Sequence, residues 1–279
     1  MTSRLSEDGK TVIVLPGTKK LRDKEYKGNT KIERVVCTKN MEEIGDLSFF
    51  GCTSLTSIEL KPGLKRIGNC TFWDCDRVTH VSFVEGMEEI GDLSFQHCTA
   101  LTSIELKPGL KTIGDATFEG CCQLTHVSFV NGMNEIGYGS FQDCISLQSI
   151  SLKPDLKNIG IGTFQECSEL TAIVVPFEDV PTSLRSSQVT VSAYQRLMGQ
   201  IRKGGAHHLK NLIVSRPLTC PERLTFDLNS FADACASEFV EIRDCEYNIA
   251  QSLHLVMFML SKFLGAACFS RYRMLVLVY

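Results

Sequence analysis

The feature that most constrains this fold is a 23-residue repeat. Stepping by 23 from Ile44, Phe49 or Cys52 meets the same residue type in six consecutive copies, without an insertion or a gap. Gly45 begins a matching glycine column, and Leu55, Ile58 and Leu60 recur as apolar residues. A unit this short cannot bury its own apolar side, so copies must stack. The sequence therefore predicts a solenoid over residues 41–176.

The repeat has a second, longer period. Residues 41–86 and 87–132 are identical at 34 of 46 positions, which indicates duplication of a two-repeat unit. Counting back by whole repeats from the clear copies reaches apolar residues in 12–40. We therefore expect residues 1–40 to form an N-terminal cap with a degenerate repeat, because an end repeat has one side in water.

Each repeat divides into three short pieces. In "LTSIEL", residues 55–60, apolar and polar residues alternate as a half-buried strand requires. "LKRIG", 64–68, predicts a second extended piece, and "KPG", 61–63, a turn. "DLSFFGC", 46–52, predicts a single helical turn that carries Phe49 and Cys52 inward. Gly45 and its equivalents are expected to supply a positive φ angle or a close approach of two backbones.

These motifs resemble the BspA-type, or Treponema pallidum-type, leucine-rich repeat. "IGDLSFFGCTSLTSIEL" and "IGDATFEGCCQLTHVSF" are similar to that family's 23-residue pattern over 41–176, and faintly over 12–40. One departure is the proline after the strand: Lys61 precedes Pro62, and Val84 with Glu85 replaces it in alternate copies. The resemblance implies an α/β repeat fold, a leucine-rich-repeat solenoid with a parallel β-sheet face. It also implies protein binding rather than catalysis.

Composition narrows the class of protein further. The formal net charge of −3 gives no basic field that would attract nucleic acid. The N-terminal residues 1–17 contain no apolar run of signal-peptide length, so we expect a cytoplasmic protein whose thirteen cysteines stay reduced. We expect no cofactor.

The repeated cysteine, histidine and glutamate positions argue against a metal site and against an enzyme. Stacked coils lie about 4.8 Å apart, so the cysteine column should form a ladder rather than a four-ligand cluster. His80 and His126 stand two coils apart, about 10 Å, which is too far to share one metal ion. Glu59 and Glu105 have the same separation, and distance alone does not exclude a glycosidase-like carboxylate pair. Nothing else in the chain supports that chemistry.

The outward side chains of the predicted strands form the best candidate binding surface. They alternate between charged rows and neutral rows with a two-coil rhythm, which would suit a protein or peptide partner with a matching rhythm. Trp73, the only tryptophan, would lie outside a turn, either as an exposed anchor or packed on a neighbouring coil. The predicted partner-binding residues are Ser57, Glu59, Lys61, His80, Ser82, Ser103, Glu105, Lys107, His126, Ser128, Ser149, Ser151 and Lys153.

The repeat stops near Pro176, and residues 177–279 form a separate C-terminal region, expected to be mixed or mainly helical. Whether this region is an ordered domain stays open. Residues 249–269 are apolar and long enough to span a bilayer, but Lys262 and His254 argue against insertion. The sequence thus favours a non-catalytic protein-interaction scaffold. The alternative is a membrane-anchored or cell-surface adhesion protein with 249–269 as its anchor.

Overall fold

The computed structural model describes residues 2–153, 155–176, 199–201, 211–215 and 239–243. The chain divides into two units. The first comprises Met1–Thr171 with Leu197–Leu209, and the second comprises Ala172–Arg196 with Lys210–Tyr279.

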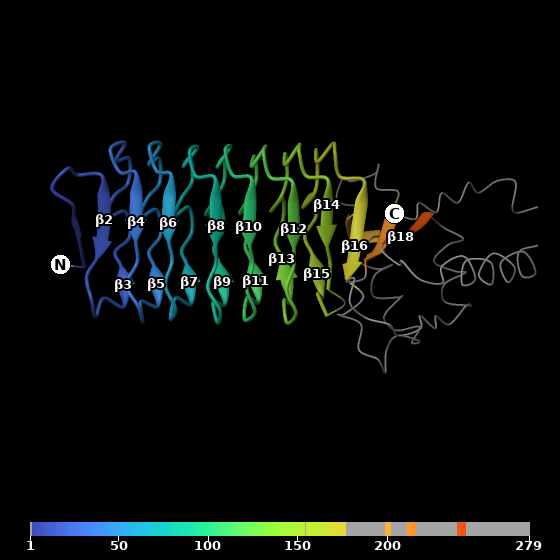
Figure 1. The fold of residues 1–279 in the computed structure, drawn as a ribbon, viewed down its shortest axis with the longest axis horizontal. Helices are drawn as coiled ribbons and strands as arrows, with labels where there is room; N and C mark the ends of the chain where they lie inside the picture. The colour runs from blue at the N-terminus through green and yellow to red at the C-terminus, as the bar shows by residue number, and fades with distance from the viewer. Residues whose placement is uncertain (1, 154, 177–198, 202–210, 216–238, 244–279) are drawn as a thin grey trace, which may run out of the picture. The chain divides into compact units, whose positions relative to one another are not determined.

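The first unit is a solenoid in which each coil contributes one strand to a front column (Figure 1). We call this column the front sheet. Its strands pair in parallel with partners 23 residues apart, as in Val12↔Val35 and Val35↔Ile58, except that the strands Ser57–Glu59 and His80–Ser82 share no pair. The short strand β1 (Ser3–Leu5) lies antiparallel to β2 and begins the column. The front strands are β2 (Thr11–Val14), β4 (Arg34–Val36), β6 (Ser57–Glu59), β8 (His80–Ser82), β10 (Ser103–Glu105), β12 (His126–Ser128) and β14 (Ser149–Ser151).

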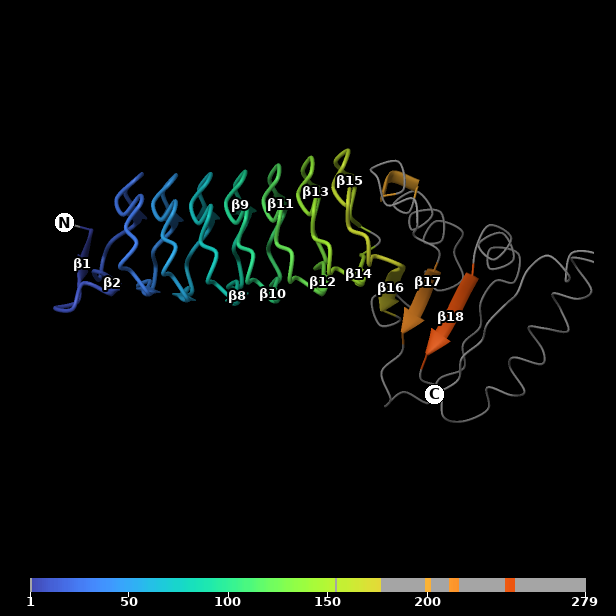
Figure 2. The same ribbon diagram turned by 90° about the horizontal axis from the view of Figure 1, so that it is seen from above.

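A second parallel sheet runs beside the front one and forms a separate column (Figure 2). Its two-residue strands come from the "LKRIG" segments, as the sequence predicts, and they pair without interruption along the whole column. They are β3 (Lys20–Leu21), β5 (Glu43–Ile44), β7 (Arg66–Ile67), β9 (Glu89–Ile90), β11 (Thr112–Ile113), β13 (Glu135–Ile136) and β15 (Asn158–Ile159).

The third side of each coil corrects the expected helical turn. Residues 46–51 form consecutive turns, and Leu47 and Gly51 have φ angles of 57° and 68°. A right-handed helix excludes such left-handed residues. Alternate amides of the segment, those of Leu47, Phe49 and Gly51, donate to the following coil, as in Phe49 to the Thr71 carbonyl at 2.9 Å. The described coils are therefore built of strands and turns, so the α/β prediction is wrong in its helical part.

The core consists of side-chain columns that run along the solenoid. Phe49 and Phe72 are fully buried and stacked, with ring centroids 5.4 Å apart, and the same stacking continues from Tyr26 to Phe164. Leu55, Ile58 and Leu60 point inward with their equivalents, as the alternation predicts. Stacking of identical rings adds to the apolar burial that holds adjacent coils together.

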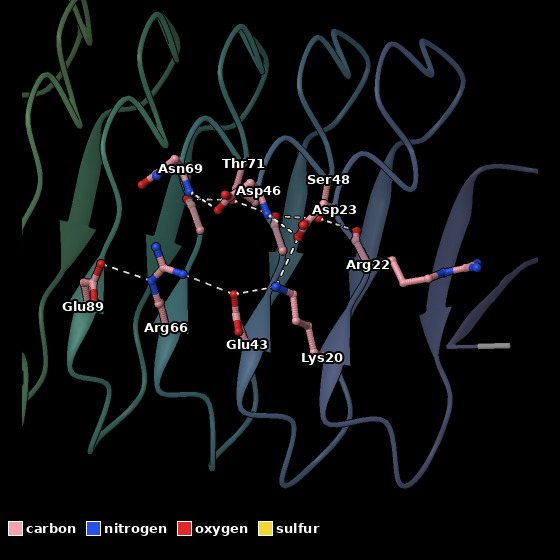
Figure 3. A network of polar contacts seen from close by, with 12 residues as sticks. Lys20, Arg22, Asp23, Glu43, Asp46, Ser48, Arg66, Asn69, Thr71 and Glu89 are labelled. Carbon is pink, nitrogen blue, oxygen red and sulfur yellow. Dashed lines mark hydrogen bonds and ion pairs between the residues drawn. The ribbon is translucent and has the colours of Figure 1, made fainter.

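Polar ladders cross between coils beside this core (Figure 3). The Asp46 carboxylate accepts a hydrogen bond from the backbone amide of Asn69 at 2.8 Å, and equivalent bonds run from Asp23 to Tyr138. The buried hydroxyl of Thr71 donates to the carbonyl of Gly68 at 2.8 Å and to that of Gly45 at 3.2 Å. These bonds satisfy backbone groups that no sheet reaches.

The second unit contains three described strands. β16 (Ala172–Pro176) pairs in parallel with β17 (Asn211–Ser215), which pairs in parallel with β18 (Phe239–Arg243). The only described helical residues beyond 176 are 199–201. Most of the region expected to be mixed or mainly helical, including 249–269, lies outside the described residues. Within the described part of the chain, no helix is long and apolar enough to cross a membrane.

Candidate interaction face

The thirteen predicted partner-binding residues all lie on the outward side of the front sheet or just after its strands, and we call this surface the front face. Most of its side chains are exposed or half-buried. Ser151 is the exception, because it is only 4% exposed and its hydroxyl has no hydrogen-bond partner among the described residues. The prediction that Ser151 faces solvent is therefore wrong, although its strand position is correct.

Side chains on the front face bond to one another across coils. His80 Nδ1 lies 2.7 Å from Ser103 Oγ, and the Ser82 hydroxyl donates to Glu105 at 2.7 Å. His126 Nδ1 lies 2.9 Å from the hydroxyl oxygen of Ser149. These bonds hold the side chains in fixed positions before any partner arrives.

The two carboxylates of the front face are held by cations. Glu59 accepts hydrogen bonds from Lys61 and, at 2.8 Å, from Arg34. The bond from Lys61 is the larger influence that lowers the pKa of Glu59, and Arg34 adds to it. Hydrogen bonds from Lys107 and, to a smaller extent, from Ser82 likewise lower the pKa of Glu105. Both carboxyls are therefore ionised near neutral pH.

Arg34 was not among the predicted residues, although a sequence signal for it existed. Counting back 23 from Ser57 reaches Arg34, and Arg34 opens β4 as Ser57 opens β6. The degenerate N-terminal repeat therefore extends the front face by one charged position.

The histidines of the front face are placed as expected, two coils apart and each beside a serine. Partial desolvation lowers the pKa of His126, so its imidazole is neutral at pH 7. Among the described residues, no group of three or more histidine, cysteine or acidic side chains could hold a metal ion.

The cysteine column is a hydrogen-bonding ladder inside the core. Each thiol points to the carbonyl of the phenylalanine or tyrosine 26 residues earlier, as in Cys98 to Phe72 at 3.3 Å. Burial raises the pKa of Cys52 to about 11 and holds that of Cys98 higher still. A thiol that is buried and protonated is a poor nucleophile and a poor metal ligand, so this column is structural.

Trp73 packs on a neighbouring coil instead of standing free. Its ring meets Phe50 edge to face with centroids 5.3 Å apart, and the Lys27 ammonium lies 4.8 Å from the centre of the Phe50 ring. The indole N–H is buried without a partner among the described residues. Of the two readings left open by the sequence, packing is the one that the structure shows.

The second sheet also carries a charged surface, and in its N-terminal coils the charges are neutralised by cross-coil ion pairs. Lys20 pairs with Glu43 at 3.0 Å, Glu43 with Arg66 at 3.2 Å, and Arg66 with Glu89 at 3.1 Å (Figure 3). Along these four coils the charges therefore alternate in sign, and each of the four has its partner in an adjacent coil. This surface differs from the front face, where histidine and serine alternate with the charged rows.

The repeats of this chain match a known protein family. The model of the BspA type leucine rich repeat region matches residues 19–134 and 88–187, with six copies, and so spans more than half of the chain. The chain belongs to the BspA-type leucine-rich repeat family. The predicted resemblance is thereby confirmed, and the match reaches into the N-terminal repeat.

One solved structure supports this fold. The chain is similar to the leucine-rich repeat protein of Treponema pallidum, at 24% identity and a TM-score of 0.53, over 70% of this chain and 92% of that one. A leucine-rich repeat protein from Bacteroides ovatus matches at 16% identity and a TM-score of 0.38, covering 87% of this chain and 83% of that one. No curated protein matches the chain significantly.

Proposed function

We propose that this BspA-type repeat protein is a non-catalytic scaffold that binds a protein or peptide partner through its front face. Solenoids of leucine-rich repeats generally mediate protein–protein interaction. The observation that carries the proposal is the set of cross-coil bonds that fix exposed front-face side chains, such as His80 to Ser103.

Fixed side chains favour binding for a physical reason. A side chain that is already ordered loses less conformational entropy when a partner covers it, so more of the contact energy appears as affinity. The repeated strands also place equivalent groups at regular intervals, which suits an elongated partner. The front face contains no set of residues that indicates a particular reaction. Its two carboxylates, Glu59 and Glu105, are each kept ionised by a hydrogen bond from a lysine.

The test compares two variants of the full chain in affinity capture followed by mass spectrometry. The first replaces Glu59, Lys61, Glu105 and Lys107 with Ala. The matched control replaces with Ala two residues of the second sheet, Glu43 and Arg66, and the ion pair just before its strands β9 and β11, Glu88 and Lys111. A partner retained by the wild type and the control but lost from the front-face variant supports the proposal. Identical partner lists from both variants would refute it.

A further inference from the structure

The coils differ from one another mainly on the side formed by residues 46–54 and their equivalents, which we call the turn side. The duplicated units 41–86 and 87–132 differ at twelve positions, and nine of these lie in turn-side segments. The predicted front-face residues of the two units are identical, as Glu59 and Glu105 are. Chemistry that is specific to one coil is therefore concentrated on the turn side.

Two coils near the C-terminal end of the solenoid expose apolar side chains on the turn side. Tyr138 is 56% exposed, Ile161 76% and Ile145 47%, and we call these three side chains the apolar patch. The only other exposed large apolar side chain among the described residues is Leu5. Single exposed apolar residues are normal, but three that gather on one side of two adjacent coils indicate an interaction site.

The apolar patch departs from what the repeat requires structurally. At the position of Tyr138 and Ile161, the five preceding coils carry aspartate or asparagine. Each of those side chains accepts a hydrogen bond from a backbone amide of the next coil, as Asp115 does from Tyr138 at 2.7 Å. Tyr138 has no carboxylate or carboxamide, so this ladder ends at its coil. The exchange gives up a stabilising bond and exposes apolar surface, which the stability of the solenoid does not explain.

Glycines next to the apolar patch connect its members. Gly139 and Gly162 follow Tyr138 and Ile161, at a position where the five preceding coils carry larger residues. A Cβ atom added at Gly162 would lie 3.8 Å from the Tyr138 ring. The ring therefore reaches the next coil and lies beside the backbone that carries Ile161. Together they form one continuous apolar surface over two coils.

Acidic side chains without basic neighbours surround the apolar patch. The turn-side segments 115–123, 138–146 and 161–169 contain five acidic residues and no lysine or arginine. None of the five takes part in a salt bridge among the described residues, whose ion pairs lie on the sheets or in preceding coils, as that of His97 with Asp74 does. The five acids are Asp115, Glu119, Asp143, Glu166 and Glu169.

Acidic charge without counter-charge, beside apolar surface, restricts the kind of partner. Carboxylates of one sign attract a basic partner and repel nucleic acid and anionic lipid. The apolar side chains add affinity when a partner removes them from water. A protein segment with apolar residues flanked by lysine or arginine meets both conditions, whereas an acidic or wholly polar segment meets neither.

We propose that the turn-side segments 115–123, 138–146 and 161–169 dock a basic amphipathic segment of a partner protein. Apolar side chains of that segment cover the apolar patch, and its lysine or arginine side chains lie against the surrounding carboxylates. This surface shares no residue with the front face. The inference therefore goes beyond the proposed function and does not rest on it.

Calorimetry on the full chain tests the apolar contacts with a synthetic amphipathic peptide of leucine and lysine. We expect the wild type to bind it, and the double variant Tyr138→Asp, Ile161→Asp to bind it about tenfold more weakly or less. This variant restores the residue type of the preceding coils, so we expect it to fold. It also adds negative charge, so attraction by charge alone would make binding tighter instead of weaker.

A second pair of variants tests the charges. Asp143→Asn with Glu166→Gln should weaken binding about three- to tenfold and reduce its dependence on salt. The matched control, Glu85→Gln with Glu135→Gln, removes two exposed acids that lie away from the turn side and should keep the wild-type affinity. Peptides with glutamate in place of lysine, or serine in place of leucine, should not bind.

Cys122 reports where the peptide binds. It is half-buried and occupies the position of Ile145 in the preceding coil. Bound peptide should slow the reaction of Cys122 with iodoacetamide and leave that of the half-buried Cys70, two coils earlier, unchanged. Equal slowing of both cysteines, or of neither, would place the peptide elsewhere and overturn the inference.

Three other results would overturn the inference. The first is absence of peptide binding, or undiminished binding by the Tyr138→Asp, Ile161→Asp variant. The second is binding of spermine as tight as that of the peptide, because it would indicate a site for cations alone. The third is self-association of the wild type in ultracentrifugation that the same variant abolishes, because a second copy of the chain would then cover the apolar patch.

Discussion

A glycine in the close contact between coils gives the sharpest test of how the solenoid is held together. A Cβ atom added at Gly91 would lie 2.5 Å from Asn69 Oδ1 and 2.8 Å from the carbonyl carbon of Gly68. Backbone atoms of the preceding coil cannot move away independently, so Gly91→Ala must push two coils apart. The displacement also weakens two cross-coil hydrogen bonds, Gly91 to Ile67 and Asp92 to Asn69, both 2.9 Å long.

The magnitude follows from these two effects. Overpacking costs about 1–3 kcal/mol, and two weakened hydrogen bonds add about 1 kcal/mol each, so Gly91→Ala should lower the free energy of unfolding by about 3–5 kcal/mol. Gly132 is the matched control. It has a φ of +84° and nothing within 4 Å of an added Cβ, so Gly132→Ala should cost only about 1–2 kcal/mol of backbone strain.

Urea denaturation followed by circular dichroism measures both variants on the full chain. With a slope of about 2–3 kcal/mol per molar urea, we expect the midpoint of Gly91→Ala to fall about 1 M below that of Gly132→Ala. Equal midpoints for the two alanine variants would show that coil contact at this column is not tight. The reasoning about close backbone approach would then be refuted.

Three further predictions concern the polar columns. Thr71→Val leaves the Gly68 carbonyl without its hydroxyl donor, while the Gly45 carbonyl keeps the hydroxyl of Ser48, and should cost about 1–3 kcal/mol, measured as a lower urea midpoint; an unchanged midpoint would contradict the ladder. Iodoacetamide should label the half-buried Cys122 in the native protein and reach Cys98 only after unfolding, with peptide mass spectrometry as the readout; early labelling of Cys98 would mean that its coil opens. Lys107→Met should raise the pKa of Glu105 toward its ordinary value, followed by NMR titration of the carboxyl. Because the folded pKa is lowered, the stabilisation from this carboxylate is present above its unfolded pKa and is lost as pH falls through its folded pKa. The variant should therefore lose less stability over that acid range.

Much of the fold could be predicted because each column of the repeat has one environment. The alternation of apolar and polar residues along the strand predicts that the Ile58 side chain points inward and the Ser57 side chain outward. Both side chains are placed as predicted. The inward Phe49 and Cys52 were likewise correct, since a residue type repeated at a fixed step must pack against its own copies. Any one of these columns would have been weak evidence in a single copy.

The errors come from features that a single repeat does not encode. The 46–52 segment has a helix-like pattern, but Leu47 adopts a left-handed conformation because its amide bonds to Asn69 of the next coil at 2.9 Å. Local propensity cannot reveal a bond whose acceptor lies 22 residues away. The burial of Ser151 was likewise not predicted, because the alternation within one coil places that residue on the outward side of its strand.

The alternating ion pairs of the second sheet also limit how the number of coils can change. Lys20, Glu43, Arg66 and Glu89 form one row in which each charge bonds to the opposite sign in the adjacent coil. Deleting the coil of Arg66 alone would place Glu43 against Glu89, two like charges at about 4.8 Å. Deleting the coils of Glu43 and Arg66 together would leave Lys20 facing Glu89 and preserve the pairing. Repeat copy number in this charged part of the solenoid is therefore expected to change in steps of two, which is the step recorded in the near-identity of 41–86 and 87–132.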